Sequence, residues 1–236
     1  MQVEEKLYSL YDNYYADGSV TAKRLVTAKQ TVGLIKTLSK SPFHSVLDVG
    51  SGDGAALMEM SKEKLGSSYS AIEISSSGIE QVKARNIPNL KEALLFDGYK
   101  IPFADNSFDL AIVTHVLEHV EHERAFIREL LRVAKRVYIE LPLDHTLRIG
   151  RTIQITQKYG HINFYTPETF RNILATSGAK VESLRVFSPN REYEILGSGK
   201  LKGSIKFIVR SAALKMLPRL APRFFSYLGT AIISKL

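Results

Sequence analysis

The sequence predicts an α/β fold in which a largely parallel sheet lies between two layers of helices. Strand-like and helix-like patterns alternate from about Ser45 onward, which is typical of such folds. Some strand-like segments are short and apolar throughout, as strands buried on both faces are, including LAIV at 110–113 and VYI at 137–139. No internal repeat or low-complexity linker divides the chain, so we expect one domain over residues 1–236.

Residues 1–44 are expected to form an N-terminal helical cap on this core. Apolar side chains recur close to helical spacing between Val20 and Lys40, and four tyrosines crowd just before them. The apolar positions are Val20, Leu25, Val26, Val32, Ile35 and Leu38, and the tyrosines are Tyr8, Tyr11, Tyr14 and Tyr15.

Residues 45–187 are expected to form the core. The predicted strands are 45–49, 69–74, 93–96, 108–114, 137–141 and 180–187, and the predicted helices are 54–64, 77–86, 121–134 and 167–176. Thr166 suits the N-cap of the last of these helices because its hydroxyl can accept a hydrogen bond from the first turn. We expect residues 188–225 to be a basic amphipathic insertion and residues 226–236 to be a closing strand.

Composition restricts the chemistry that the chain can perform. The sequence contains no cysteine, which excludes disulfides, thiolate metal sites and cysteine nucleophiles. Its first residues lack the basic start and apolar core of a signal peptide, and no run reaches the ~18 apolar residues of a membrane span. We therefore expect a soluble, cytoplasmic protein.

Positive charge is concentrated near the C-terminus. Eight basic residues and no acid follow Glu194, and they account for the whole formal net charge of +8. Lys202, Lys206 and Arg210 recur every four residues, which indicates a cationic amphipathic helix. Its apolar residues are Ile205, Ile208, Val209, Ala212, Met216 and Leu217. Through residues 200–223 this segment could lie on the inner face of a membrane, cover an acceptor pocket, or pack its apolar side on the domain.

A glycine-rich loop follows the first predicted strand. VLDVGSGDG, residues 46–54, places Asp48, Gly50, Gly52 and Gly54 in the pattern D-x-G-x-G-x-G at a strand-to-helix junction. Glycine there permits positive φ angles and lets a ligand approach main-chain N–H groups. The spacing differs from the dinucleotide pattern G-x-G-x-x-G, and by itself it could also be only a tight connection.

Acidic residues end the next two predicted strands. Glu73 lies at the end of the second strand, and Asp97 at the end of the third. Neighbouring strand ends share one crevice in a doubly wound sheet, where an acid can bind ribose hydroxyls. Glu73 could instead be a surface carboxylate, and Asp97 could instead form the turn before Gly98.

Four segments together resemble class I S-adenosyl-L-methionine (SAM)-dependent methyltransferases of the small-molecule, methyltransferase-11/23-like type. They are VLDVGSGDG, AIEIS, FDGYKIPFADNSFDLAIVTHVLEHVEH and GHINFYTPETF, within residues 45–187. The resemblance implies a Rossmann-like seven-stranded sheet with an antiparallel last strand. It also implies SAM as cofactor and S-adenosyl-L-homocysteine (SAH) as the product formed from it.

The resemblance further implies where the cofactor binds. Asp48 would orient the glycine loop and meet the amino group of the methionine moiety. Glu73 would hold the ribose, and Asp97 the adenine edge. The residues after the fourth strand would lie beside the sulfonium. The implied cofactor-binding residues are Asp48, Gly50, Ser51, Gly52, Gly54, Glu73, Ile74, Asp97, Gly98, Thr114, His115 and Val116.

His115 and His161 are the candidate catalytic bases. Methyl transfer depends mainly on alignment and on exclusion of water, but a hydroxyl acceptor usually also needs a base. His115 comes just after the fourth strand, and histidine titrates near neutral pH. His161 belongs to GHINFYTPETF, which lies by the acceptor in similar enzymes. Either histidine could instead only cap or pack a turn.

The histidine-rich segment THVLEHVEH also raises the question of a metal site. His115, His119 and His122 lie within eight residues, with acids among them. The segment lacks the pattern H-E-x-x-H and a clear third ligand, so we expect no metal. Glu118 and His119 are expected to form hydrogen bonds and ion pairs at the start of a helix.

The acceptor is expected to be a small molecule, a sugar or a lipid-linked compound. Aromatic residues of the N-terminal segment and of the segment after the fifth strand could wall its pocket, although such residues are more often core. They are Tyr11, Tyr14, Tyr15, Tyr159, Phe164 and Tyr165.

Two other function classes remain open. One is a nucleic-acid methyltransferase that uses the basic C-terminal segment, although the chain lacks a D/N-P-P-Y tetrapeptide after the fourth strand. The other is a non-catalytic scaffold of the same fold at a membrane, against which the intact glycine loop argues.

Overall fold

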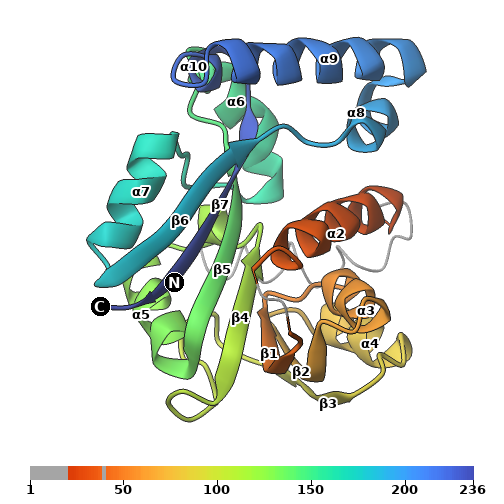
Figure 1. The fold of residues 1–236 in the computed structure, drawn as a ribbon, viewed down its shortest axis with the longest axis vertical. Helices are drawn as coiled ribbons and strands as arrows, with labels where there is room; N and C mark the ends of the chain where they lie inside the picture. The colour runs from red at the N-terminus through yellow and green to blue at the C-terminus, as the bar shows by residue number, and fades with distance from the viewer. Residues whose placement is uncertain (1–20, 39–40) are drawn as a thin grey trace.

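The computed structural model of the protein describes residues 21–38 and 41–236. A seven-stranded sheet forms its centre, in the order β3-β2-β1-β4-β5-β7-β6 (Figure 1). The pairs among β1 to β5 are parallel, whereas β7 is antiparallel to both β5 and β6. The predicted fold, with its antiparallel last strand, is therefore confirmed.

The strands follow the predicted apolar segments closely. They are β1 (Phe43–Val49), β2 (Gly66–Glu73), β3 (Leu90–Leu95), β4 (Phe108–Thr114), β5 (Ala134–Leu143), β6 (Ala179–Phe187) and β7 (Tyr227–Lys235). β5 begins three residues earlier than predicted because helix α5 ends at Val133 and leads directly into it.

Helices connect these strands, and α2 precedes the first of them. They are α2 (Thr21–Ile35), α3 (Ala55–Lys62), α4 (Ser76–Ala84), α5 (Glu123–Val133), α6 (Ile149–Thr156), α7 (Pro167–Ala175), α8 (Arg191–Ser198), α9 (Lys200–Met216) and α10 (Ala221–Phe224), with short 3-10 turns η2 (Leu117–His119) and η3 (Gln157–Tyr159). Thr166 caps α7 as predicted, accepting a hydrogen bond from Thr169 N.

Alternate strand residues build two hydrophobic cores on opposite faces of the sheet. Leu47 and Val49 of β1 pack with the buried side chains of α5 and α7. Val46, which points the other way, packs with α2, α3 and α4. The predicted helices on both faces are thus confirmed.

The N-terminal cap is observed only in part. α2 lies in the predicted segment, and its Val32 and Ile35 are buried. The tyrosines Tyr8, Tyr11, Tyr14 and Tyr15 lie outside the described residues.

Helices α8 to α10 gather beyond the end of the sheet where β5 leads into α6 (Figure 1). α8 and α9 pack closely, because a Cβ at Gly203 of α9 would lie 2.5 Å from the carbonyl oxygen of Glu194 in α8. Among the described residues, no helix has both the length and the apolar character needed to cross a bilayer.

Candidate functional site

The loop between β1 and α3 is rich in glycine and carries few side chains. Gly50, Gly52 and Gly54 have φ angles of 72°, 56° and 77°, in the left-handed region that glycine enters at little cost. A Cβ at Gly50 would lie only 2.4 Å from Cγ2 of Val116. Glycine therefore permits both the bend and the close packing of this loop against the segment after β4.

Asp48 and Ser51 place buried polar atoms at the base of the glycine loop. Their exposed fractions are 1% and 5%. Within the described residues, neither carboxylate oxygen of Asp48 nor the Ser51 hydroxyl has a hydrogen-bond partner. Burial, and after it the nearby Glu73 carboxylate, raises the pKa of Asp48 to about 8. Because unsatisfied buried polar atoms are costly, this loop suits a polar ligand that carries a positive charge.

Glu73 joins the ends of β1 and β2. Its Oε2 accepts a hydrogen bond from Gly52 N at 2.8 Å, and its Oε1 accepts from Ile74 N at 2.9 Å and from Ser75 N at 3.2 Å. The side chain is buried, and burial raises its pKa. Glu73 therefore shapes the glycine loop directly, while its binding of a ribose stays a prediction.

Asp53, which the sequence analysis did not single out, ties the glycine loop to two helices. Its Oδ1 lies 3.0 Å from Arg24 Nε of α2 and accepts from Ala55 N at 3.3 Å. Arg85, just after α4, bonds to Oδ2 and to the carbonyl oxygen of Asp53. The signal in the sequence was an acid inside the glycine loop, but its arginine partners are too distant in sequence to form a motif.

Asp97 and Gly98 form the turn after β3. Asp97 Oδ1 accepts hydrogen bonds from Tyr99 N at 2.9 Å and Lys100 N at 2.7 Å. Gly98 has a φ of 87°, and a Cβ there would lie 3.7 Å from Cγ2 of Ile74. The turn-forming role of Asp97 is thus observed, next to the end of β2, and its contact with adenine stays a prediction.

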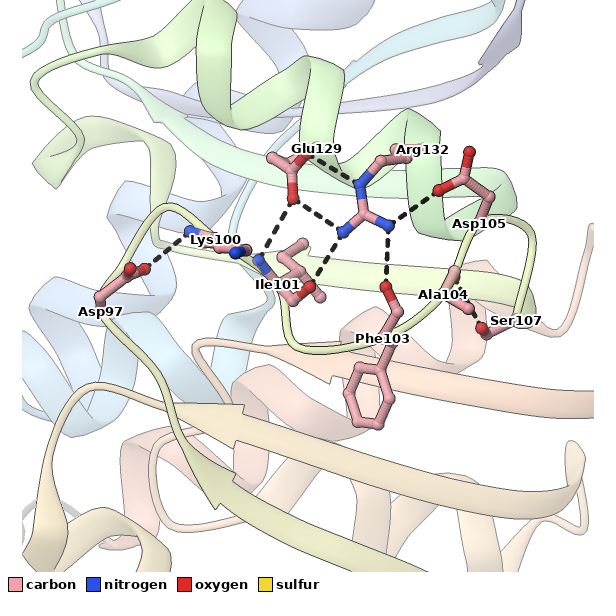
Figure 2. Close-up of polar contacts among 9 residues, drawn as sticks. All are labelled: Asp97, Lys100, Ile101, Phe103, Ala104, Asp105, Ser107, Glu129 and Arg132. Carbon is pink, nitrogen blue, oxygen red and sulfur yellow. Dashed lines mark hydrogen bonds and ion pairs between the residues drawn. The ribbon is translucent and has the colours of Figure 1, made fainter.

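Arg132 of α5 fixes the segment that follows this turn (Figure 2). Its Nη1 donates to the carbonyl oxygen of Phe103 at 2.8 Å, and its Nη2 donates to that of Ile101 at 2.9 Å. Its guanidinium also pairs with the carboxylates of Glu129 and Asp105, each at 2.9 Å. The sequence analysis missed this network, although the i, i+3 spacing of Glu129 and Arg132 on a helix was a local signal.

His115 lies at the end of β4 in a left-handed conformation, with a φ of 56°. Its Nδ1 is 3.4 Å from Glu118 Oε1, and its Nε2 is 3.6 Å from Glu140 Oε1. Burial by itself would lower the pKa of His115, but the two carboxylates outweigh it and raise the pKa to about 10. Both ring nitrogens face carboxylates in the unliganded protein, and the role of His115 as a general base stays a prediction.

His161 packs against His119 and not against His115. The rings of His119 and His161 meet edge to face, with their centroids 4.8 Å apart. Burial lowers the pKa of His161 to about 4. The structure therefore separates the two predicted bases, and Glu118 lies between them with a fully buried side chain.

A comparison with protein families identifies the core. Residues 47–137 match the family model described as a methyltransferase domain. These residues form a class I SAM-dependent methyltransferase domain. The glycine loop, the strand-end acids and β4 of this methyltransferase domain are the elements described above, so the predicted family is confirmed.

Curated relatives share the methyltransferase domain over part of their length. The demethylmenaquinone methyltransferase of Corynebacterium efficiens is 34% identical over 98 residues, which are 42% of this chain and 40% of that protein. The norajmaline N-methyltransferase of Rauvolfia serpentina is 26% identical over 138 residues, which are 53% of this chain and 47% of that protein. The matched part thus spans less than half the length of these two relatives.

A solved structure resembles the methyltransferase domain together with its flanking helices. The geranyl diphosphate C-methyltransferase of Streptomyces coelicolor A3(2), crystallised with Mg²⁺, geranyl diphosphate and SAH, has a TM-score of 0.71 and 11% identity. The likeness covers 100% of this chain and 99% of that one. At this identity it shows the fold, which agrees with the predicted cofactor.

Proposed function

We propose that this protein is an enzyme that transfers the methyl group of SAM to a hydroxyl or amine of a small, sugar or lipid-linked acceptor. The observation that carries the proposal is the buried carboxylate of Asp48 below a loop of left-handed glycines, a carboxylate without a hydrogen-bond partner among the described residues. The amino group of SAM would supply a positively charged partner for this carboxylate. The names of the matched relatives, which include a quinone methyltransferase and an N-methyltransferase, support a small-molecule acceptor.

The residues around the loop fit the parts of the cofactor. Asp48 and Ser51 would hold the methionine end, Glu73 the ribose, and Ile74 with Gly98 the adenine. When bound, SAM supplies an electrophilic methyl group next to its sulfonium. The protein contributes alignment of the acceptor and exclusion of water, and these effects supply much of the rate in such displacements.

The acceptor side of the proposal concerns the segment after β4. Thr114 and Val116 flank His115, whose ring nitrogens both face carboxylates. We assign His115 to hydrogen-bond donation and to positioning of the acceptor. An amine acceptor in its neutral form already carries its nucleophilic lone pair, so its attack on the methyl group does not require a base at this position.

Binding of SAM is the first test of this proposal. Calorimetry on the full chain should show stoichiometric binding of SAM and SAH. Glu73→Ala should weaken SAM binding roughly ten- to a hundredfold, as expected for hydrogen bonds to a charged group. Glu92→Ala, which removes an exposed carboxylate of β3, is the matched control and should leave the affinity unchanged.

Two results would contradict the proposal. A folded wild-type protein that gives no heat with either SAM or SAH would refute it entirely. Unchanged affinity in a folded Glu73→Ala variant would refute the ribose assignment alone. Methyl transfer itself is then measured with labelled SAM against quinones, phenols, sugars and lipid-linked compounds.

We further propose that helices α9 and α10 dock on an anionic membrane surface. Several apolar side chains of α9 face outward: Ile205, Ile208 and Met216 are 52%, 62% and 77% exposed. Leu217, Leu220 and Phe224 continue this exposed surface. A contiguous apolar surface of this kind is unusual for a face in contact with water alone.

Charges around this surface favour a membrane over nucleic acid. Lys206 and Arg210 both pair with Glu194 of α8. Exposed bases beside the apolar side chains include Lys202, Lys215 and Arg219. Apolar side chains next to basic ones match the interface of an anionic bilayer, where both kinds are stabilised.

Vesicle sedimentation tests the membrane contact. The full chain should bind vesicles that contain phosphatidylglycerol and bind pure phosphatidylcholine vesicles much less. The double substitution Ile205→Glu, Ile208→Glu should abolish binding. Leu95→Glu, which alters a leucine of β3 that is 55% exposed, should have no effect. Retention on RNA or DNA without binding to either vesicle would contradict this proposal.

A further inference from the structure

Three side chains of types that can ligate a metal ion lie close together where η2 faces the chain just after η3. One carboxylate oxygen of Glu118 and one ring nitrogen each of His119 and His161 lie within 4.8 Å of one another. His115 and His122, which the sequence grouped with His119, do not belong to this cluster. Folding brings His161 to it from another segment, 42 residues after His119.

Glu118 supplies the carboxylate of the cluster. Its side chain is fully buried, and within the described residues neither of its oxygens makes a hydrogen bond. Its Oε1 lies 3.4 Å from His115 Nδ1, at ion-pair distance but without hydrogen-bond geometry. A buried carboxylate is normally compensated by hydrogen bonds, ion pairs or a metal ion.

The His119 ring is oriented as a metal-ligating histidine is. Its Nδ1 lies 3.0 Å from the carbonyl oxygen of Gly160. A carbonyl oxygen can only accept, so Nδ1 carries the proton, and in the neutral ring Nε2 carries the lone pair. Nε2 lies 4.0 Å from Glu118 Oε1. Histidines that bind metals usually donate their second N–H in this way.

Main-chain hydrogen bonds hold the two sides of the cluster together. The carbonyl oxygen of Glu118 accepts from Ile162 N at 2.9 Å and from Asn163 N at 3.0 Å. Asn163 Nδ2 donates to the carbonyl oxygens of Leu117 and Val120. In addition, the buried Nδ1 of His161 makes no hydrogen bond within the described part of the chain. The cluster is therefore built before any ion binds.

We propose that Glu118, His119 and His161 bind one divalent transition-metal ion, such as Zn²⁺. Two imidazoles and one carboxylate form a donor set typical of Zn²⁺ and of its first-row neighbours. Three protein ligands leave a coordination position open for water or for an oxygen of a small molecule. This site does not depend on the proposed methyl transfer.

Titration with Zn²⁺ tests the site. The full chain, without an affinity tag and after treatment with a chelator, should bind one equivalent of Zn²⁺ in calorimetry. His161→Ala and Glu118→Gln should each weaken this binding at least roughly tenfold, since either change removes a ligand. Glu118→Gln keeps the shape of the side chain, so it guards against a loss that results only from misfolding.

His122→Ala is the matched control, because His122 is exposed and lies outside the cluster. It should leave the affinity for Zn²⁺ unchanged. Co²⁺ substitution should add a visible absorption band that disappears in His161→Ala. The proposal is overturned if folded wild-type protein binds no stoichiometric Zn²⁺, or if His122→Ala loses as much affinity as His161→Ala. SAM titration of the same samples shows separately whether the cofactor site is intact.

Discussion

Asp48 is a residue whose ionisation depends strongly on its surroundings. It ends β1 without a hydrogen-bond partner among the described residues, and its pKa is raised to about 8. In the unliganded protein its carboxyl is therefore mostly protonated near neutral pH. A cationic amino group beside it would lower this pKa and expel the proton.

SAM binding should therefore release protons, up to about one per site, between the two pKa values of Asp48. The affinity should rise with pH through this range and level off above about 8, where Asp48 is already ionised. Calorimetry in buffers of different ionisation enthalpy measures the release. Asp48→Asn should abolish it, and proton release that persists in this variant would assign the effect to another group.

The stability of the unliganded protein gives an independent measurement of the same group. Because the folded-state pKa is raised, the contribution of Asp48 to stability is greatest below its unfolded pKa and is lost as pH rises through about 8. The melting temperature of Asp48→Asn should thus fall less across this range than that of the wild type. Parallel curves would contradict the raised pKa.

At the residue level, sequence predicted which groups surround the site better than it predicted their roles. The positions of Asp48 and the glycines followed from one strand-to-helix pattern, and that of Glu73 followed from the end of the next strand. The charge state of His115 was not predicted, because it depends on Glu118 and also on Glu140 of the neighbouring strand β5. Contacts between segments that are far apart in the sequence produce no periodic pattern of residues.

At the element level, the turn and loop after β3 depend on α5. Arg132 holds Ile101 and Phe103 by their carbonyl oxygens (Figure 2). We expect Arg132→Met to lower the free energy of unfolding by roughly 2–4 kcal/mol, because it leaves several acceptors unpaired. Urea denaturation measures this change. Arg128→Met, which alters an exposed residue of the same helix, should have little effect, and equal losses would contradict the anchoring role.

The orientation of α9 shows the limit of helical periodicity. The pattern of Lys202, Lys206 and Arg210 correctly predicted an amphipathic helix, but periodicity does not say which face turns inward. Glu194 of α8 attracts Lys206 and Arg210, and Gly203 permits the close approach of the two helices. Ile205, Ile208 and Met216 remain exposed, whereas Ala213 and Leu214 pack against the core.

At the scale of the whole molecule, the sheet was the most predictable feature. Short apolar strands such as 110–113 and the alternation with helices specify a parallel α/β core. The antiparallel direction of β7 followed only from the family resemblance, since no feature of YLGTAIISKL indicates which strands lie beside it. The cluster of Glu118, His119 and His161 was not predicted, because only the folded course of the chain after β5 brings His161 close to the other two residues.

The position of β7 has a consequence for synthesis of the protein. β6 is made first, yet its place is at the rim of the sheet, and β7 is the strand it pairs with. Until residues 227–235 have left the ribosome, β5 has an edge without its β7 partner, and β6 lacks the strand with which it pairs. Until β7 has been synthesised and pairs with both strands, the edges of β5 and β6 must be kept from pairing with strands of other proteins.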